Sequence, residues 1–137
     1  MDIEEVHKFE QTVVMFMNEF LGWDLDWAGG QCQSFDAIGY SPKKIKCCIE
    51  MKFRNKYYPK KLLEKNKYDN MMEIDDELVK LYLVSDPKGT YIFWLNDLEM
   101  PEVKELYCPD TTIWTKKKVI KPVYLLSEEM ASIVTLE

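Results

Sequence analysis

The chain has 137 residues, with 24 Asp and Glu against 18 Lys and Arg, and a net charge of −6. This length suits one domain around one hydrophobic core, so residues 1–137 are expected to form a single domain. No run approaches the roughly 20 consecutive apolar residues of a membrane span. The N-terminal MDIEEVHKFE opens with acids rather than a basic and apolar leader. We therefore expect a cytoplasmic protein that does not contact a membrane.

The four cysteines are expected to be reduced and buried, as is usual in a cytosolic protein. Cys47 and Cys48 are neighbours on an expected strand and point to opposite faces. The cysteines also lack the spaced CxxC pairs of a structural zinc site, which argues against such a site.

Positive charge is concentrated in one segment. Between residues 43 and 67 there are ten basic and two acidic residues, a net charge of +8, so the remainder of the chain carries −14. Such asymmetry is typical of a polyanion-binding face on an acidic protein, although a run of lysines is also compatible with an ordinary solvated surface.

In chain order, the first half is expected to form a helix and then strands. Residues 2–20 have apolar side chains at helical spacing, with Asp2 as the N-cap. The stretch 22–33 is rich in turn residues and holds a short strand. Residues 34–40 and 45–54 are strand-like and flank the turn-forming Ser-Pro-Lys-Lys, which predicts a hairpin.

The second half is expected to contain a helix, two strands joined by a tight turn, an irregular region and a last strand. We expect the helix at 61–73 and the two strands at 79–85 and 90–95. The irregular region is expected at 98–119 and the last strand at 119–126. Within the irregular region we expect a short helix after Pro101. Pro122 interrupts the last strand, which favours an edge position because proline cannot donate a ladder hydrogen bond.

The hairpin alternates sharply between two kinds of side chain. The odd positions are small or apolar, as a face packed under a helix requires: Phe35, Ala37, Gly39, Ile45, Cys47, Ile49, Met51 and Phe53. This alternation sets a register that pairs Asp36 with Glu50. The even face then presents Asp36, Glu50 and Lys52 together. Two adjacent carboxylates repel each other, so a hard cation between them, with Lys52 beside it, is the arrangement the pattern favours.

The first helix carries an acid inside its apolar stripe. Glu10 is the only charged residue in the stripe, whose members are Ile3, Val6, Glu10, Val13, Met17 and Phe20. Either Glu10 lies at the edge of the stripe and reaches water, or it faces the hairpin and joins Asp36 and Glu50. The sequence leaves both readings open. His7, the one histidine, has no accompanying Cys or Ser arrangement, which argues against a nucleophilic triad.

A helix with Glu10, then Asp36, and Glu50-Met51-Lys52 after thirteen further residues, resembles the PD-(D/E)XK, or restriction-endonuclease-like, superfamily. The match covers about the first half of the chain, and the segments that follow look like those of small phage-type members. The resemblance implies an α/β (α+β) fold with a central mixed β-sheet flanked by the N-terminal helix and a second helix. Phe35 stands where the family usually has proline.

The resemblance also implies a nuclease that depends on Mg²⁺ or Mn²⁺. Its metal ligands would be Asp36, Glu50 and the Met51 carbonyl, with Glu10 as a further ligand, and Lys52 would act on the attacking water. Phosphate contacts are expected from four basic residues, namely Lys46, Arg54, Lys56 and Lys67. Gln31 and Gln33 either flank the site or are solvated loop residues, and the sequence leaves both readings open.

The expected partner is a nucleic acid, DNA in preference to RNA, in the cytoplasm of a cell that can include a phage- or virus-infected host. A homo-oligomer is left open. Two other functions compete with the nuclease. One is a catalytically silent domain of the same fold that binds DNA or protein. The other is an acidic, DNA-mimicking inhibitor, which the low pI of about 4.9 favours and the +8 segment opposes.

Overall fold

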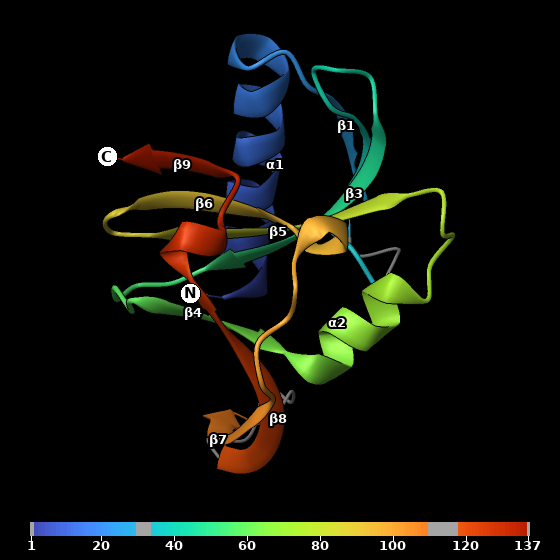
Figure 1. Cartoon of the computed structure of the whole chain (residues 1–137). Coiled ribbons are helices and arrows are strands. Elements are labelled where there is room, and N and C mark those ends of the chain that lie inside the picture. The colour runs from blue at the N-terminus through green and yellow to red at the C-terminus, as the bar shows by residue number, and fades with distance from the viewer. Residues whose placement is uncertain (1, 30–33, 110–117, 137) are drawn as a thin grey trace.

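The computed structural model describes residues 2–29, 34–109 and 118–136 (Figure 1). Its helices are α1 (Ile3–Phe20) and α2 (Lys65–Met72), with short 3₁₀ turns η1 (Leu95–Asp97) and η2 (Glu128–Met130). Its strands are β1 (Asp24–Trp27), β2 (Ala37–Tyr40), β3 (Lys46–Phe53), β4 (Lys60–Glu64), β5 (Val79–Asp86), β6 (Gly89–Trp94), β7 (Lys104–Pro109), β8 (Lys118–Ser127) and β9 (Ile133–Leu136).

The described strands form two sheets. The larger has the order β1-β2-β3-β5-β6-β9 and the smaller the order β4-β8-β7. Strands β3 and β5 are parallel, whereas the other neighbouring pairs are antiparallel. A parallel pair needs a crossover connection, which β4 and α2 supply here. The expected mixed sheet with an N-terminal helix and a second helix is therefore confirmed.

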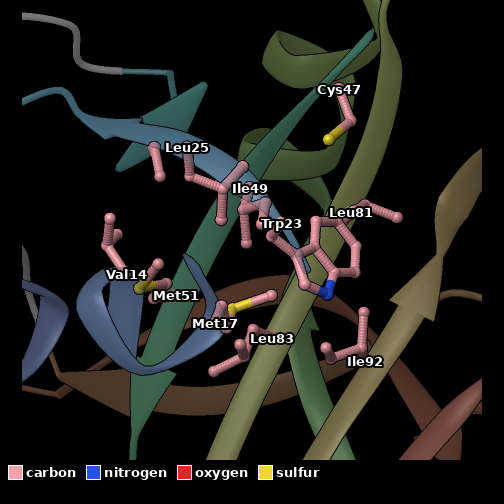
Figure 2. Close-up of a cluster of buried hydrophobic side chains, with 11 residues drawn as sticks. Val14, Met17, Trp23, Leu25, Cys47, Ile49, Met51, Leu81, Leu83 and Ile92 are labelled. Atoms are coloured by element: carbon pink, nitrogen blue, oxygen red, sulfur yellow. The ribbon is translucent and has the colours of Figure 1, made fainter. Parts of the chain in front are cut away.

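Both faces of the larger sheet are buried. Helix α1 covers one face, where Val14 and Met17 pack against Ile49, Met51 and Leu83 (Figure 2). Helix α2, β4 and β8 cover the other face with a second apolar cluster. Strand β3 accordingly has five consecutive buried residues, at positions 47 to 51. This central strand carries the predicted Glu-x-Lys.

Several local predictions are confirmed. Asp2 caps α1, since its Oδ1 accepts a hydrogen bond from the Glu5 amide at 2.8 Å. A short strand, β1, lies within 22–33, and β2 and β3 form the expected antiparallel hairpin. Their register ends with the pair of Ala37 and Ile49, so Asp36 and Glu50 lie just outside the ladder, and the Asp36 amide donates to the Ile49 carbonyl at 2.8 Å. The described cysteines, at positions 47, 48 and 108, are buried.

The predicted core faces of the hairpin and of α1 were each partly wrong. Phe35 packs with the cluster beneath α2 rather than with the one under α1, because the chain leaves regular strand geometry before β2. Ile45 is 39% exposed in the turn. On α1, Ile3 and Phe20 are mostly exposed at the helix ends, and Val14 takes the expected core place of Val13, which is only partly buried.

The segment 61–73 is not one helix. Its first part is strand β4, which pairs with β8, and only the part from Lys65 is helical. The sequence KKLLE has good helix propensity, but pairing with β8 buries Leu63 and overrides that local preference.

The prediction of a short helix after Pro101 was also wrong. It holds strand β7 rather than a helix, and β7 exists only because β8 pairs with it. Strand β8 is the middle strand of its sheet, not an edge. Pro122 is tolerated because β4 pairs only with residues 123–127, so Pro122 lies just past the end of that ladder. Residues 110–117 of the expected irregular region lie outside the described residues. No described helix combines the length and hydropathy that crossing a membrane would need.

Candidate active site

One pocket, of about 250 Å³, brings the predicted chemistry together. Its walls include side chains from α1, from the segment just before β2, from β3 and from α2. Five of these are the charged residues Glu10, Asp36, Glu50, Lys52 and Lys67. The structure thus gathers residues separated by up to 57 positions in the chain.

Asp36 is held in place by the backbone of the neighbouring strand. Its Oδ2 accepts a hydrogen bond from the Met51 amide at 2.8 Å, and its own amide donates to the Ile49 carbonyl at 2.8 Å. Burial raises the pKa of the Asp36 carboxyl, and the Met51 hydrogen bond offsets part of that rise. The side chain is therefore fixed at the end of β2, where it meets β3.

Glu50 projects from β3 into the same pocket. Its side chain is only 11% exposed and accepts an ion-paired hydrogen bond from the Lys67 ammonium at 3.3 Å. Burial, and next the negative charge of Asp36, raise the pKa of Glu50 to about 7. Two carboxyl groups in a buried site therefore compete for positive charge, and Lys67 of α2 supplies some of it.

Glu10 does face inward, as one of the two sequence readings required. It is 5% exposed, and its Oε1 accepts a hydrogen bond from the Trp27 indole Nε1 at 3.0 Å. Burial raises the pKa of Glu10, the Trp27 bond lowers it, and the charge of Asp36 raises it further. The His7 ring lies edge-on to Trp27, with centroids 5.3 Å apart, and also lines the pocket.

Lys52 follows Glu50 on the same face of β3. Burial, and then the nearby charges of Arg54 and Lys67, lower the pKa of the Lys52 ammonium. Its proton is therefore held less tightly than that of a surface lysine, which suits a group that exchanges protons with a water or alkoxide.

Within the described ranges, no group of three or more His, Cys, Asp or Glu side chains is arranged to hold a metal ion. The donor set still fits Mg²⁺. This ion is usually bound by one or two carboxylates, with waters and substrate phosphates completing its shell, rather than by an all-protein cage. Asp36 and Glu50 offer hard oxygen ligands whose mutual repulsion a cation would relieve. Glu10, turned to Trp27, stands beside this pair.

The four basic residues that were predicted to contact phosphates do not all lie at the pocket. Lys67 lines the pocket, and Arg54 lies near enough to affect the pKa of Lys52. Lys46 is exposed at the start of β3, the end away from Glu50, and Lys56 is exposed between β3 and β4. The expected flanking residues Gln31 and Gln33 lie outside the described residues.

The sequence does not predict the roles of two residues at the site. Trp27 lies outside the pocket lining and donates its indole N–H to Glu10, and His7 lines the pocket although no nucleophile accompanies it. His7 precedes Glu10 by three residues, so both share one helical face. That spacing is a signal that could have placed His7 in the site. Nothing local could have paired Trp27 with α1.

Comparisons with known proteins support the fold. No protein-family model matches the chain, and no curated protein matches it either. A solved structure of Archaeoglobus fulgidus Hjc, a Holliday junction resolvase from an archaeal hyperthermophile, is similar with a TM-score of 0.59. The match covers 92% of this chain and 94% of that chain at 11% sequence identity. The chain therefore has the α/β, restriction-endonuclease-like fold of Hjc. Nothing in the comparisons connects it to a phage.

Proposed function

We propose that this chain is a divalent-metal-dependent nuclease that hydrolyses phosphodiester bonds in DNA. The observation that carries the proposal is the convergence of Asp36, Glu50 and Lys52 in one pocket, with Glu10 and Lys67 on its walls. The likeness to a Holliday junction resolvase supports DNA as the substrate class. The chemistry of the pocket, rather than the fold, is the reason to propose catalysis.

Asp36 and Glu50 are the side chains that would hold Mg²⁺ or Mn²⁺, together with the Met51 carbonyl. The Met51 amide donates to Asp36, and the amide and carbonyl of one strand residue point to the same side of the strand. The Met51 carbonyl therefore lies toward Asp36. Glu10 is placed to add a carboxylate oxygen. When bound, the ion lowers the pKa of a coordinated water and neutralises phosphate charge.

The two lysines of the pocket have separate tasks. The lowered pKa of Lys52 favours its neutral amine, which orients the attacking water and accepts its proton, and the ammonium that results offsets charge on the pentacoordinate phosphate. Lys67 is 44% exposed and ion-paired with Glu50. A phosphate that enters the pocket offers Lys67 a second anionic partner. Lys67 therefore positions the phosphate backbone of the DNA without reading the base sequence.

A cleavage assay tests the proposal. The full chain is incubated with linear duplex, single-stranded and four-way-junction DNA, and with RNA, in the presence of Mg²⁺, Mn²⁺ or EDTA. We expect cleavage of DNA that requires the metal and falls at least ~100-fold in Asp36→Asn and in Lys52→Ala, since each removes an electrostatic contribution to the transition state. Asp26→Asn, an exposed aspartate on β1, is the matched control and should cleave normally.

Each outcome of that assay is decisive. Cleavage that survives both pocket substitutions would refute the assignment of the site. The absence of cleavage of every substrate under every metal condition would favour the catalytically silent alternative. Cleavage confined to RNA would retain the mechanism and replace the substrate.

A further inference from the structure

Strand β8 has two halves with different surroundings. Residues 123–127 pair with β4, whereas residues 118–123 pair with β7. Strand β7, Lys104–Pro109, and residues 118–123 of β8 form a ribbon, which we call the β7–β8 ribbon and which is two-stranded beyond the end of β4. Figure 1 shows it projecting from the body of the molecule, away from the larger sheet. A two-stranded ribbon has marginal stability in water alone.

One face of the β7–β8 ribbon presents large apolar side chains to solvent. Tyr107 is 71% exposed and its cross-strand partner Ile120 is 57% exposed. The neighbouring pair of Glu105 and Pro122 is exposed too, as is Lys118. Tyr107 and Ile120 sit opposite each other, so their side chains form one continuous patch. An apolar patch of this kind, flanked by charged residues, is typical of a binding surface.

The charge of the β7–β8 ribbon indicates what kind of partner fits it. Its described residues include the lysines Lys104, Lys118 and Lys121 against a single acid, Glu105. Lys104 and Lys118 are exposed, and Lys104 lies 3.5 Å from an exposed acid, Glu102, just before the ribbon. The ribbon is therefore positive on a chain whose net charge is −6. Lys118 lies on the face of Tyr107 and Ile120, and Lys104 and Lys121 lie on the opposite face. A ribbon with lysines on both faces and an exposed aromatic ring matches a nucleic acid, whose phosphates need cations and whose bases and sugars offer apolar surface.

The root of the ribbon is fixed to the helix that lines the pocket. Lys121 forms an ion pair with Glu64 at 2.8 Å, and Glu64 immediately precedes α2. The Tyr68 ring of α2 packs edge-on against Tyr124 of β8, with centroids 5.2 Å apart. Helix α2 also carries Lys67 into the pocket. A polyanion that contacts Lys67 can therefore continue along the same structural unit onto the ribbon.

We infer that the β7–β8 ribbon is a second nucleic-acid contact, which grips duplex DNA on one side of the bond cut in the pocket. The inference rests on the proposed function. A two-stranded β-ribbon fits the major groove of B-DNA. The six residues of β7 span about 20 Å at ~3.3 Å per residue, the length of about six base pairs at ~3.4 Å each. Lys104 and Lys118 contact phosphates, while Tyr107 and Ile120 pack against sugars and base edges.

Binding measurements on the full chain test this inference. Fluorescence anisotropy in EDTA gives Kd for a labelled 30-base-pair duplex at several salt concentrations. The ribbon variant is Tyr107→Thr with Ile120→Thr, which keeps β-propensity. Its matched control is Phe20→Ala with Met15→Ala on α1, because Phe20 and Met15 are also 71% and 57% exposed. We expect Kd to rise at least tenfold in the ribbon variant only.

A charge variant covers the possibility that the double substitution disturbs the ribbon. Lys118→Gln changes an exposed side chain, and it should reduce the slope of log Kd against log salt by about one, as loss of one phosphate contact does. Lys43→Gln, exposed in the β2–β3 turn, should not. On a duplex shortened by about six base pairs on one side of the cut, the ribbon variant and wild type should have the same Kd. The reason is that the shortened duplex lacks the length that the ribbon spans.

The results separate this inference from the proposed function. If pocket variants abolish cleavage while ribbon variants bind the long duplex as tightly as wild type, the ribbon inference alone is wrong. If no variant and no wild-type chain binds DNA, both are wrong. If sedimentation shows a wild-type dimer that the ribbon variant dissociates, with Kd for DNA unchanged, the surface binds a second copy of the chain and the inference is overturned.

Discussion

Replacing Glu50 with glutamine should stabilise the metal-free protein at high pH. The glutamine keeps the shape of the side chain and removes a buried charge from the neighbourhood of Asp36. Because burial and Asp36 raise the pKa of Glu50 from 4.5 to about 7, ionising this group works against folding. The side chain is only 11% exposed, so solvent screening is limited.

The sign and size of the effect follow from linkage. The folded chain binds the Glu50 proton more tightly than the unfolded chain, so this contribution to stability is fully present below pH 4.5 and is lost as pH rises through 7. A difference of one in pKa corresponds to about 1.36 kcal/mol, which gives wild type a penalty of about 3 kcal/mol above pH 7. Glu50→Gln should therefore be about 2–3 kcal/mol more stable than wild type at pH 8, and equally stable near pH 4.5.

Urea denaturation in EDTA at several pH values between 4.5 and 8 measures this difference. Glu19→Gln, at an exposed position of α1, is the control and should show no pH-dependent difference. Added Mg²⁺ should stabilise wild type, by about 2.7 kcal/mol at a concentration 100 times its Kd, and should stabilise Glu50→Gln much less. A stability difference that does not change with pH, or a variant less stable than wild type at pH 8, would refute the reasoning.

Three further predictions concern other contacts. Trp27→Phe keeps an aromatic ring but removes the 3.0 Å hydrogen bond to the buried Glu10, so kcat for cleavage should fall about tenfold with KM for DNA nearly unchanged, while urea denaturation should show a loss of about 1–3 kcal/mol because the Glu10 carboxylate loses its partner. Glu10→Gln should weaken Mn²⁺ binding in calorimetric titration while Glu19→Gln does not, because an amide oxygen is a poorer ligand than a carboxylate; equal affinities would mean that Glu10 is no ligand. Lys61→Met should cost about 3–5 kcal/mol in urea denaturation, since it leaves Asp86 buried without its 2.7 Å partner, and adding Asp86→Leu should recover part of the loss.

The sequence alone determined the features that depend on local periodicity. Alternation along residues 45–54 identified a strand and its core face, and the shared apolarity of two strands set the β2–β3 register, in which Ala37 pairs with Ile49. Helical spacing placed Glu10 in the apolar stripe of α1 and left open whether it faces the hairpin, which the packing of α1 decided. The strand predictions succeeded because a one-residue slip would turn the apolar side chains of the core face outward, so the pattern admits few alternatives.

Tertiary structure decided the features that depend on contacts between distant segments. KKLLE became strand β4 and the segment after Pro101 became β7, because both pair with β8, which begins 54 residues after the end of β4 and nine residues after the end of β7. The Trp27 bond to Glu10 exists because β1 packs beside α1. Local propensity contributes about a kcal/mol or less per residue. Pairing and burial outweigh it, and they are set by the assembled sheet rather than by any one segment.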